Sequence, residues 1–174
     1  PTTSGEGDTV GLLFDLNAAG PSSEGRGELA PLATLRGHSA ALSVAAFSAD
    51  GSLLVTGSDD RSLRIWDGKT GQPLRQLEGH RDSIRAVAFS PDGRRLLSGG
   101  ADRSARLFDA VQASPLHAFG GQVGSVRTVL FSPDGSQALT VDSGDRAWLW
   151  SAASGQLLAA LAKATQTSHN AMTF

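Results

Sequence analysis

The sequence predicts an all-β protein built from repeated four-stranded antiparallel units, and three observations support this prediction. Three segments with a shared pattern start at residues 35, 77 and 119, which are 42 residues apart. Within each segment, short apolar and β-branched runs alternate with turns rich in Gly, Pro, Asp and Ser, as expected of short strands. No segment keeps the apolar spacing of about 3.6 residues that a helix requires. A repeat of this length indicates that each unit buries its apolar face against its neighbours.

Each repeat is expected to hold four strands. The first, such as 84–89, leads into Ser90-Pro91-Asp92-Gly93, where proline presets φ and glycine accepts a positive φ. The second spans 53–56, 95–98 or 137–140, and the third alternates apolar and polar residues, as in 63–66, which predicts one buried face. The fourth, such as 73–77, starts with proline. Proline cannot donate to a neighbouring strand, so this strand is expected at an outer edge.

The repeat divides the chain, as one domain (1–174), into about four units. Residues 1–35 align with the last three strands of a unit and form a partial one, and residues 16–28, rich in Gly, Ser and Pro, are predicted to be a loop insertion. Complete repeats span 36–77, 78–119 and 120–161, and residues 166–174 are predicted to contain the first strand of a next unit. Because both ends fall at the same hairpin position and residue 1 is not Met, we expect an excerpt of a longer protein.

Composition excludes several classes of function. A net charge of −2, with 18% charged residues, lacks the basic excess that binding to nucleic acid requires. The chain has no cysteine, and therefore no disulfide framework, thiolate zinc site or cysteine nucleophile. It has no apolar run of the roughly 20 residues that a membrane helix needs. Abundant Ala, Gly and Arg suggest a bacterial-like source, and the expected location is cytoplasmic.

Four residue types recur at fixed offsets in the repeats: a histidine, a Ser or Thr, an aspartate and an aromatic residue. A chain from Trp N–H through hydroxyl and imidazole to carboxylate would satisfy these buried groups and pin a loop to a strand and a turn. The sets are His38, Thr56, Asp60 and Trp66; His80, Ser98, Asp102 and Phe108; and Gln122, Thr140 and Trp150, with Gly144 at the aspartate position and Asp145 one place late; the partial unit supplies Ser4, Asp8 and Phe14.

A serine hydrolase is the competing interpretation, because His80, Asp82 and Ser83 lie close together in sequence. Such an enzyme needs one special set of a nucleophile, a base and an orienting acid. The histidine instead recurs with partners at a fixed period, which indicates a structural role. We therefore expect a protein that is not an enzyme and has no catalytic, metal-binding or cofactor-binding residues.

These residues resemble the WD-repeat (WD40) family of β-propellers, which is named for Gly-His and Trp-Asp pairs. Gly37-His38 and Trp66-Asp67 match both pairs, the second unit keeps Gly79-His80 but ends in Phe108-Asp109, and the third keeps neither pair. The resemblance implies that each four-stranded sheet is one blade, stiffened by the His–Ser/Thr–Asp–Trp network. Since phenylalanine cannot donate a hydrogen bond, only the first unit is expected to form the complete tetrad.

The resemblance also implies a non-enzymatic scaffold that presents one rim of the propeller to partner proteins or peptides. The alternative is a propeller module that regulates or targets an attached kinase or protease. Arginines on the rim suit an acidic peptide, because the guanidinium group matches carboxylates; local pairing of these charges is the competing interpretation. The candidate rim residues are Ser39, Ser43, Asp59, Arg81, Asp82, Ser83, Arg85 and Arg127.

Propellers contain about 4 to 8 blades, so about four blades' worth of sequence predicts a partial or permuted ring. Three ways to complete it remain open: the remainder of a longer chain, a homo-oligomer with a second copy, or pairing of the last strand with the first three. We favour the first. Neither nucleic acid nor a membrane is expected as a partner.

Overall fold

The computed structural model describes residues 10–13 and 31–161, which form strands and turns without a helix. The all-β prediction is confirmed. Within these residues no helix is available that could cross a membrane. Three antiparallel sheets of four strands and one pair of strands make up the fold.

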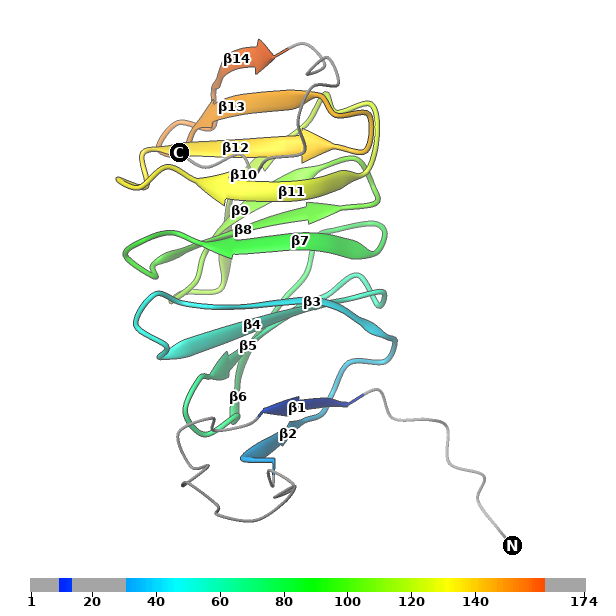
Figure 1. The fold of residues 1–174 in the computed structure, drawn as a ribbon, viewed down its shortest axis with the longest axis vertical. Helices are drawn as coiled ribbons and strands as arrows, with labels where there is room; N and C mark the ends of the chain where they lie inside the picture. The colour runs from blue at the N-terminus through cyan, green and yellow to red at the C-terminus, as the bar shows by residue number, and fades with distance from the viewer. Residues whose placement is uncertain (1–9, 14–30, 162–174) are drawn as a thin grey trace, which may run out of the picture.

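The strands fall into one partial and three complete blades (Figure 1). The partial blade pairs β1 (Gly11–Leu13) with β2 (Ala33–Leu35). Blade 1 holds β3 (Leu42–Phe47), β4 (Leu53–Ser58), β5 (Leu63–Asp67) and β6 (Pro73–Leu77). Blade 2 holds β7 (Ile84–Phe89), β8 (Arg95–Gly100), β9 (Ala105–Asp109) and β10 (Ser114–Phe119). Blade 3 holds β11 (Val126–Phe131), β12 (Gln137–Asp142), β13 (Ala147–Ser151) and β14 (Leu157–Leu161).

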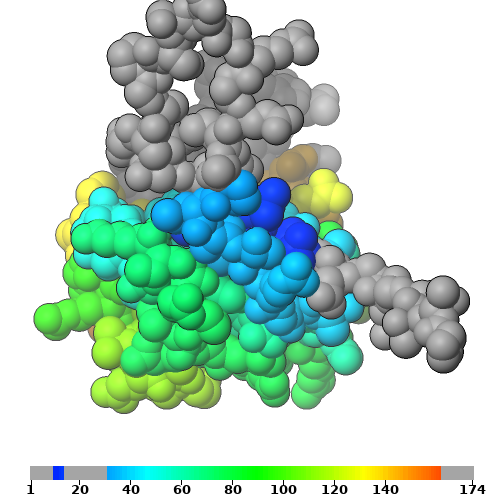
Figure 2. Space-filling model, turned by 90° about the horizontal axis from the view of Figure 1, so that it is seen from below, coloured from blue at the N-terminus to red at the C-terminus, as the bar shows by residue number. Residues whose placement is uncertain are grey.

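The blades follow one another along the long axis, with the first strands β3, β7 and β11 side by side on one face (Figure 1). At one end of the array, β1 and β2 lie over blade 1 (Figure 2). In the part that the structure describes, the array does not close into a ring. The proline strand β6 lies at the outer edge of its sheet, as predicted.

The second strands run two residues further than the sequence predicted, to Ser58, Gly100 and Asp142. Each first strand contains an irregularity in register, between Leu42 and Val44 in blade 1, and equivalent ones in blades 2 and 3. Because a bulge adds one residue to the first strand, pairing continues beyond it. The expected loop at 16–28, the predicted strand in 166–174, and Ser4, Asp8 and Phe14 lie outside the described residues.

The core lies between the blades. Blade 1 contributes Val55, Ile65 and Leu77 to one apolar cluster, in which Ile84 and Phe108 belong to blade 2. An equivalent cluster joins blades 2 and 3, where the Phe119 ring stacks on Trp150 with centroids 5.0 Å apart. Burying one such side chain contributes about 1.5–3 kcal/mol. These clusters hold neighbouring blades together and fix the loops at both ends of the strands.

Candidate functional site

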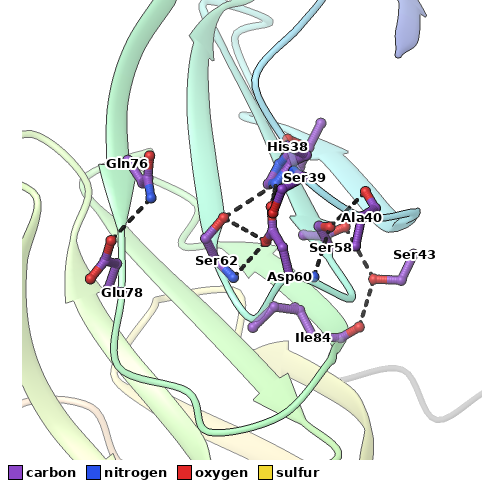
Figure 3. Close-up of polar contacts among 12 residues, drawn as sticks. His38, Ser39, Ala40, Ser43, Ser58, Asp60, Ser62, Gln76, Glu78 and Ile84 are labelled. Atoms are coloured by element: carbon purple, nitrogen blue, oxygen red, sulfur yellow. Dashed lines mark hydrogen bonds and ion pairs between the residues drawn. The ribbon is translucent and has the colours of Figure 1, made fainter. Parts of the chain in front are cut away.

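Four residues in blade 1 form a continuous chain of hydrogen bonds. Trp66 Nε1 donates to Thr56 Oγ1 at 2.9 Å, and Thr56 Oγ1 lies 2.8 Å from His38 Nε2. Since the threonine oxygen accepts from Trp66, its own hydrogen is assigned to Nε2, which leaves His38 Nδ1–H to donate to Asp60 at 2.8 Å. Figure 3 shows His38 and Asp60 beside Ser62, whose hydroxyl donates to Asp60 at 2.7 Å.

Asp60 is the charged end of this chain. Burial alone would raise the pKa of its carboxyl group, but hydrogen bonds from Ser62, His38 and the Ser39 N–H outweigh burial and lower the pKa to about 2. The carboxylate therefore remains ionised at neutral pH. It ties the loop after Gly37-His38 to the turn between β4 and β5.

The network in blade 2 lacks its tryptophan. His80 Nε2 lies 2.8 Å from Ser98 Oγ, and Nδ1 lies 3.0 Å from Asp102. Phe108 fills the tryptophan position, fully buried, and has no group to donate. Burial lowers the pKa of His80, although Asp102 opposes the shift. This histidine is therefore neutral at physiological pH.

In blade 3 the buried carboxylate belongs to a residue that the repeat pattern did not indicate. Trp150 Nε1 donates to Thr140 Oγ1 at 3.0 Å, but the carboxylate comes from Asp142 rather than from Asp145. Asp142 is 2% exposed and accepts from the N–H groups of Val123, Gly124, Gly144 and Arg146 at 3.3, 3.1, 2.8 and 3.2 Å. Asp145 is exposed, at the end of the same turn.

Asp142 reaches the donors that the tetrad aspartates use in the other blades. Val123 and Arg146 lie 84 residues, or two repeat periods, after Ser39 and Ser62, respectively. The N–H groups of Ser39 and Ser62 donate to Asp60. Burial would raise the pKa of Asp142, and these hydrogen bonds outweigh burial and lower it. One carboxylate thus holds the same loop and turn from a position two residues earlier in the repeat.

Gln122 takes the place of histidine in blade 3. Its amide nitrogen is assigned toward the carbonyl oxygens of Phe119 and Arg103, at 3.2 and 3.1 Å. The end of the amide that lies 3.3 Å from Thr140 Oγ1 is then the oxygen, which accepts the hydroxyl hydrogen. Gln122 therefore links blade 3 to blade 2, and no feature of the sequence pattern indicates this link.

The glycine of each Gly-His pair is required by its backbone and by its neighbours. Gly37 and Gly79 have φ of +131° and +136°, angles that residues with a Cβ rarely adopt. A Cβ at Gly37 would lie 2.8 Å from Arg64 Nη1, and one at Gly79 would lie 3.2 Å from Arg106 Nη1. Each glycine thus leaves room for an arginine from the third strand.

The charged residues of the candidate rim are all exposed. Arg81 and Asp82 lie in the loop between β6 and β7, and Arg127 lies on β11. Arg85, on β7, forms an ion pair with Asp59 of blade 1, with 3.4 Å between Nη1 and Oδ1. Both side chains are about 40% exposed, so this pair contributes less than about 1 kcal/mol to stability.

The predicted rim serines are mostly engaged by the fold. Ser83 is buried, so its side chain is not part of the exposed rim. The Ser43 hydroxyl donates to Ile84 O at 2.6 Å, across the boundary between blades 1 and 2 (Figure 3). Ser39 is exposed, and its N–H donates to Asp60 at 3.0 Å.

A polar hollow of about 300 Å³ lies beside the rim, between the Gly-His loops of blades 1 and 2. Asp60, Arg61 and Arg64 line it together with Gln76 and Glu78. Gln76 Nε2 donates to Glu78 at 3.1 Å (Figure 3). Among residues 10–13 and 31–161, no three His, Asp or Glu side chains are grouped to hold a metal ion. The hollow offers charges of both signs.

The family model described as "WD domain, G-beta repeat" matches residues 29–67 and 71–109. The chain is a WD-repeat protein. The first match contains β2 to β5 and the second contains β6 to β9, so each matched repeat starts with the outer strand of one blade and ends with the third strand of the next.

One curated relative is "Protein Mut11" of Chlamydomonas reinhardtii, which is 44% identical over 69 residues. The match covers 38% of this chain and 19% of the relative. The matched segment therefore spans about a fifth of the length of that protein. WD repeats typically bind protein partners.

Proposed function

We propose that this WD-repeat chain is a non-enzymatic scaffold that binds an acidic peptide of a partner protein through Arg81, Arg85 and Arg127. The carrying observation is that all three arginines are exposed on a rim whose loops are held by buried networks. Arginine forms paired hydrogen bonds with carboxylates. A pre-ordered rim also reduces the entropy lost on binding.

Arg85 differs from the other two because it already pairs with Asp59. A partner carboxylate has to compete with Asp59 for this guanidinium group. The pair is exposed and screened by salt, so the competition costs little. Removal of the Asp59 charge is nevertheless expected to have a measurable effect, and this second variant should strengthen peptide binding rather than weaken it.

The test measures binding of a fluorescein-labelled glutamate-rich peptide by fluorescence polarisation. The triple variant Arg81→Ala, Arg85→Ala, Arg127→Ala is expected to weaken binding at least about tenfold, since each lost contact costs about 0.5–1 kcal/mol. Asp59→Asn is expected to strengthen binding about twofold to threefold. The matched control replaces Lys69, Arg75 and Arg94, three exposed cations outside the rim, with alanine.

Equal losses in the two triple variants would show that only net charge matters, and the rim assignment would be wrong. The same triple variant serves in a pulldown, where an unchanged set of bound proteins would also contradict the proposal. A propeller module attached to a kinase or protease is the second candidate, and the sequence beyond both ends decides it. An extended chain that holds only further repeats would rule this candidate out.

A further inference from the structure

The end of the array opposite the Gly-His loops carries a second feature, which the rim does not use. Phe47, Phe89 and Phe131 are the last residues of β3, β7 and β11. The three first strands lie side by side, so the three rings come to the same end. Together with Leu130, Pro91 and Pro133 they line a hollow of about 420 Å³, which we call the aromatic hollow.

The aromatic hollow is apolar and accessible. Phe47 is 51% exposed, an unusual state for a ring that could otherwise pack in a core. The nearby serines offer nothing to a ligand, because Ser48, Ser90 and Ser132 are buried and donate their hydroxyl hydrogens to aspartates of the turns. A volume of this size lies within the range of ligand pockets, about 300–1,000 Å³.

Carboxylates lie on the turns that adjoin this apolar surface. Asp50, Asp92 and Asp134 lie on the three turns that follow the first strands, and all three are exposed. Hydrogen bonds from serine hydroxyls and turn N–H groups lower the pKa of Asp50 and of Asp134 to about 2. The turns of blades 1 and 3 carry no cation to balance these charges.

The turn of blade 2 adds two arginines, of which one is engaged by the fold. Arg95 donates from Nη2 to Gly135 O at 2.9 Å and lies over the Phe131 ring, 5.8 Å from its centroid. Arg94 is exposed beside Asp92. The Arg95 guanidinium group therefore lies at the turn of blade 3, whereas the turn of blade 1, which carries Asp50, has no cation of its own.

We propose that the aromatic hollow docks a peptide segment of a partner protein in which an apolar anchor is flanked by Lys or Arg. The anchor fills the space between the phenylalanine rings, and the basic residues face the carboxylates on the turns. Arg85 lies four residues before Phe89 on β7, and Arg127 lies four residues before Phe131 on β11, which separates the hollow from the arginine rim by roughly 13 Å. The two surfaces can therefore be occupied independently, and this proposal does not depend on the function proposed for the rim.

The probe is a fluorescein-labelled peptide, Lys-Lys-Leu-Phe-Leu-Lys-Lys, with two comparison peptides that replace Lys by Glu or the apolar residues by Ser. Fluorescence polarisation with the 174-residue chain is expected to show binding of the first peptide. The Glu and Ser versions are expected to bind at least about tenfold more weakly. Binding of all three peptides with equal affinity would overturn the proposal.

Variants locate the site. Phe47→Ser is expected to weaken binding about fivefold to tenfold, since a half-buried aromatic contact is worth about 1 kcal/mol. The matched control is Leu74→Ser, which removes a 43% exposed leucine on the outer strand β6 and is expected to leave binding unchanged. The pair Asp50→Asn and Asp134→Asn keeps an acceptor for the serines and is expected to reduce the dependence of binding on salt.

Two results would overturn the assignment while leaving the fold intact, as judged by tryptophan emission. In the first, the basic peptide binds Phe47→Ser as well as wild type but fails to bind the triple rim variant, which would place it on the rim. In the second, wild type is a dimer that Phe47→Ser converts to a monomer, with no peptide bound, which would make a second copy the occupant.

Discussion

Asp142→Asn is the substitution that most directly tests how blade 3 is held together. The wild-type carboxylate accepts four main-chain hydrogen bonds, two on each oxygen. Asparagine keeps the size of the side chain and one acceptor oxygen. It turns an NH₂ group toward the other pair of N–H donors, so that pair loses its partner and faces another donor.

The magnitude follows from the two lost bonds. A hydrogen bond to a charged group contributes about 1.5–3 kcal/mol. Val123, Gly144 and Arg146 lie at the surface, however, so water can replace part of what the carboxylate supplied. We expect Asp142→Asn to lower the free energy of unfolding by about 2 kcal/mol. With a slope of about 2 kcal/mol per molar urea, the unfolding midpoint falls by about 1 M.

The assay is urea unfolding monitored by tryptophan emission, and Trp148 and Trp150 of blade 3 contribute to this signal. The matched control is Asp145→Asn. Asp145 is exposed and has a φ of +58°, which asparagine tolerates as well as aspartate does, so the expected change is below about 0.5 kcal/mol. A larger loss for Asp145→Asn than for Asp142→Asn would refute the assignment of the carboxylate.

The remaining predictions concern the other networks and one turn. Trp66→Phe removes the Nε1 donor from buried Thr56 and is expected to cost about 1–2 kcal/mol in urea unfolding; no cost would mean that this bond is not a stabilising one. Because burial lowers the pKa of His80 in the folded chain from its ordinary 6.5, the unfolded state binds more protons below pH 6.5. Stability is therefore expected to fall as the pH drops through that region. It is expected to fall again between about pH 4 and 2, as Asp60 protonates. Urea midpoints measured against pH check both losses, and His80→Gln is expected to remove only the first. Arg103 has a φ of +62°, so Arg103→Gly is expected to raise the midpoint by relieving about 0.5–1 kcal/mol of backbone strain, and a lower midpoint would contradict this reasoning.

Much of the fold was predictable because the repeat aligns equivalent residues. The period places a turn after each of Phe47, Phe89 and Phe131, and the proline at the start of 73–77 indicates the outer edge correctly. The strand ends were predicted less accurately. Pairing beyond the bulge depends on main-chain hydrogen bonds, and the side-chain types of residues such as Ser58 and Asp142 do not indicate them. Local sequence patterns carry little information about such bulges.

The candidate site was predictable only where the same residue type recurs. His38 and Asp60 stand at the repeat positions of His80 and Asp102, and alignment alone identifies them. Asp142 replaces a missing aspartate from another position, and this replacement follows from where its carboxylate lies in space rather than from its place in the repeat. The burial of Ser83 likewise depends on tertiary packing, which no property of Arg81-Asp82-Ser83 as a sequence reveals.

The offset between matched repeat and blade has a consequence for how such a chain can change in length. The match at 71–109 carries the outer strand of blade 1 and the first three strands of blade 2. Deleting or duplicating one 42-residue period therefore takes strands from two sheets at once, and the strands on either side of the junction pair again as one complete sheet. Such a change in length would add or remove one whole blade without exposing a new sheet edge.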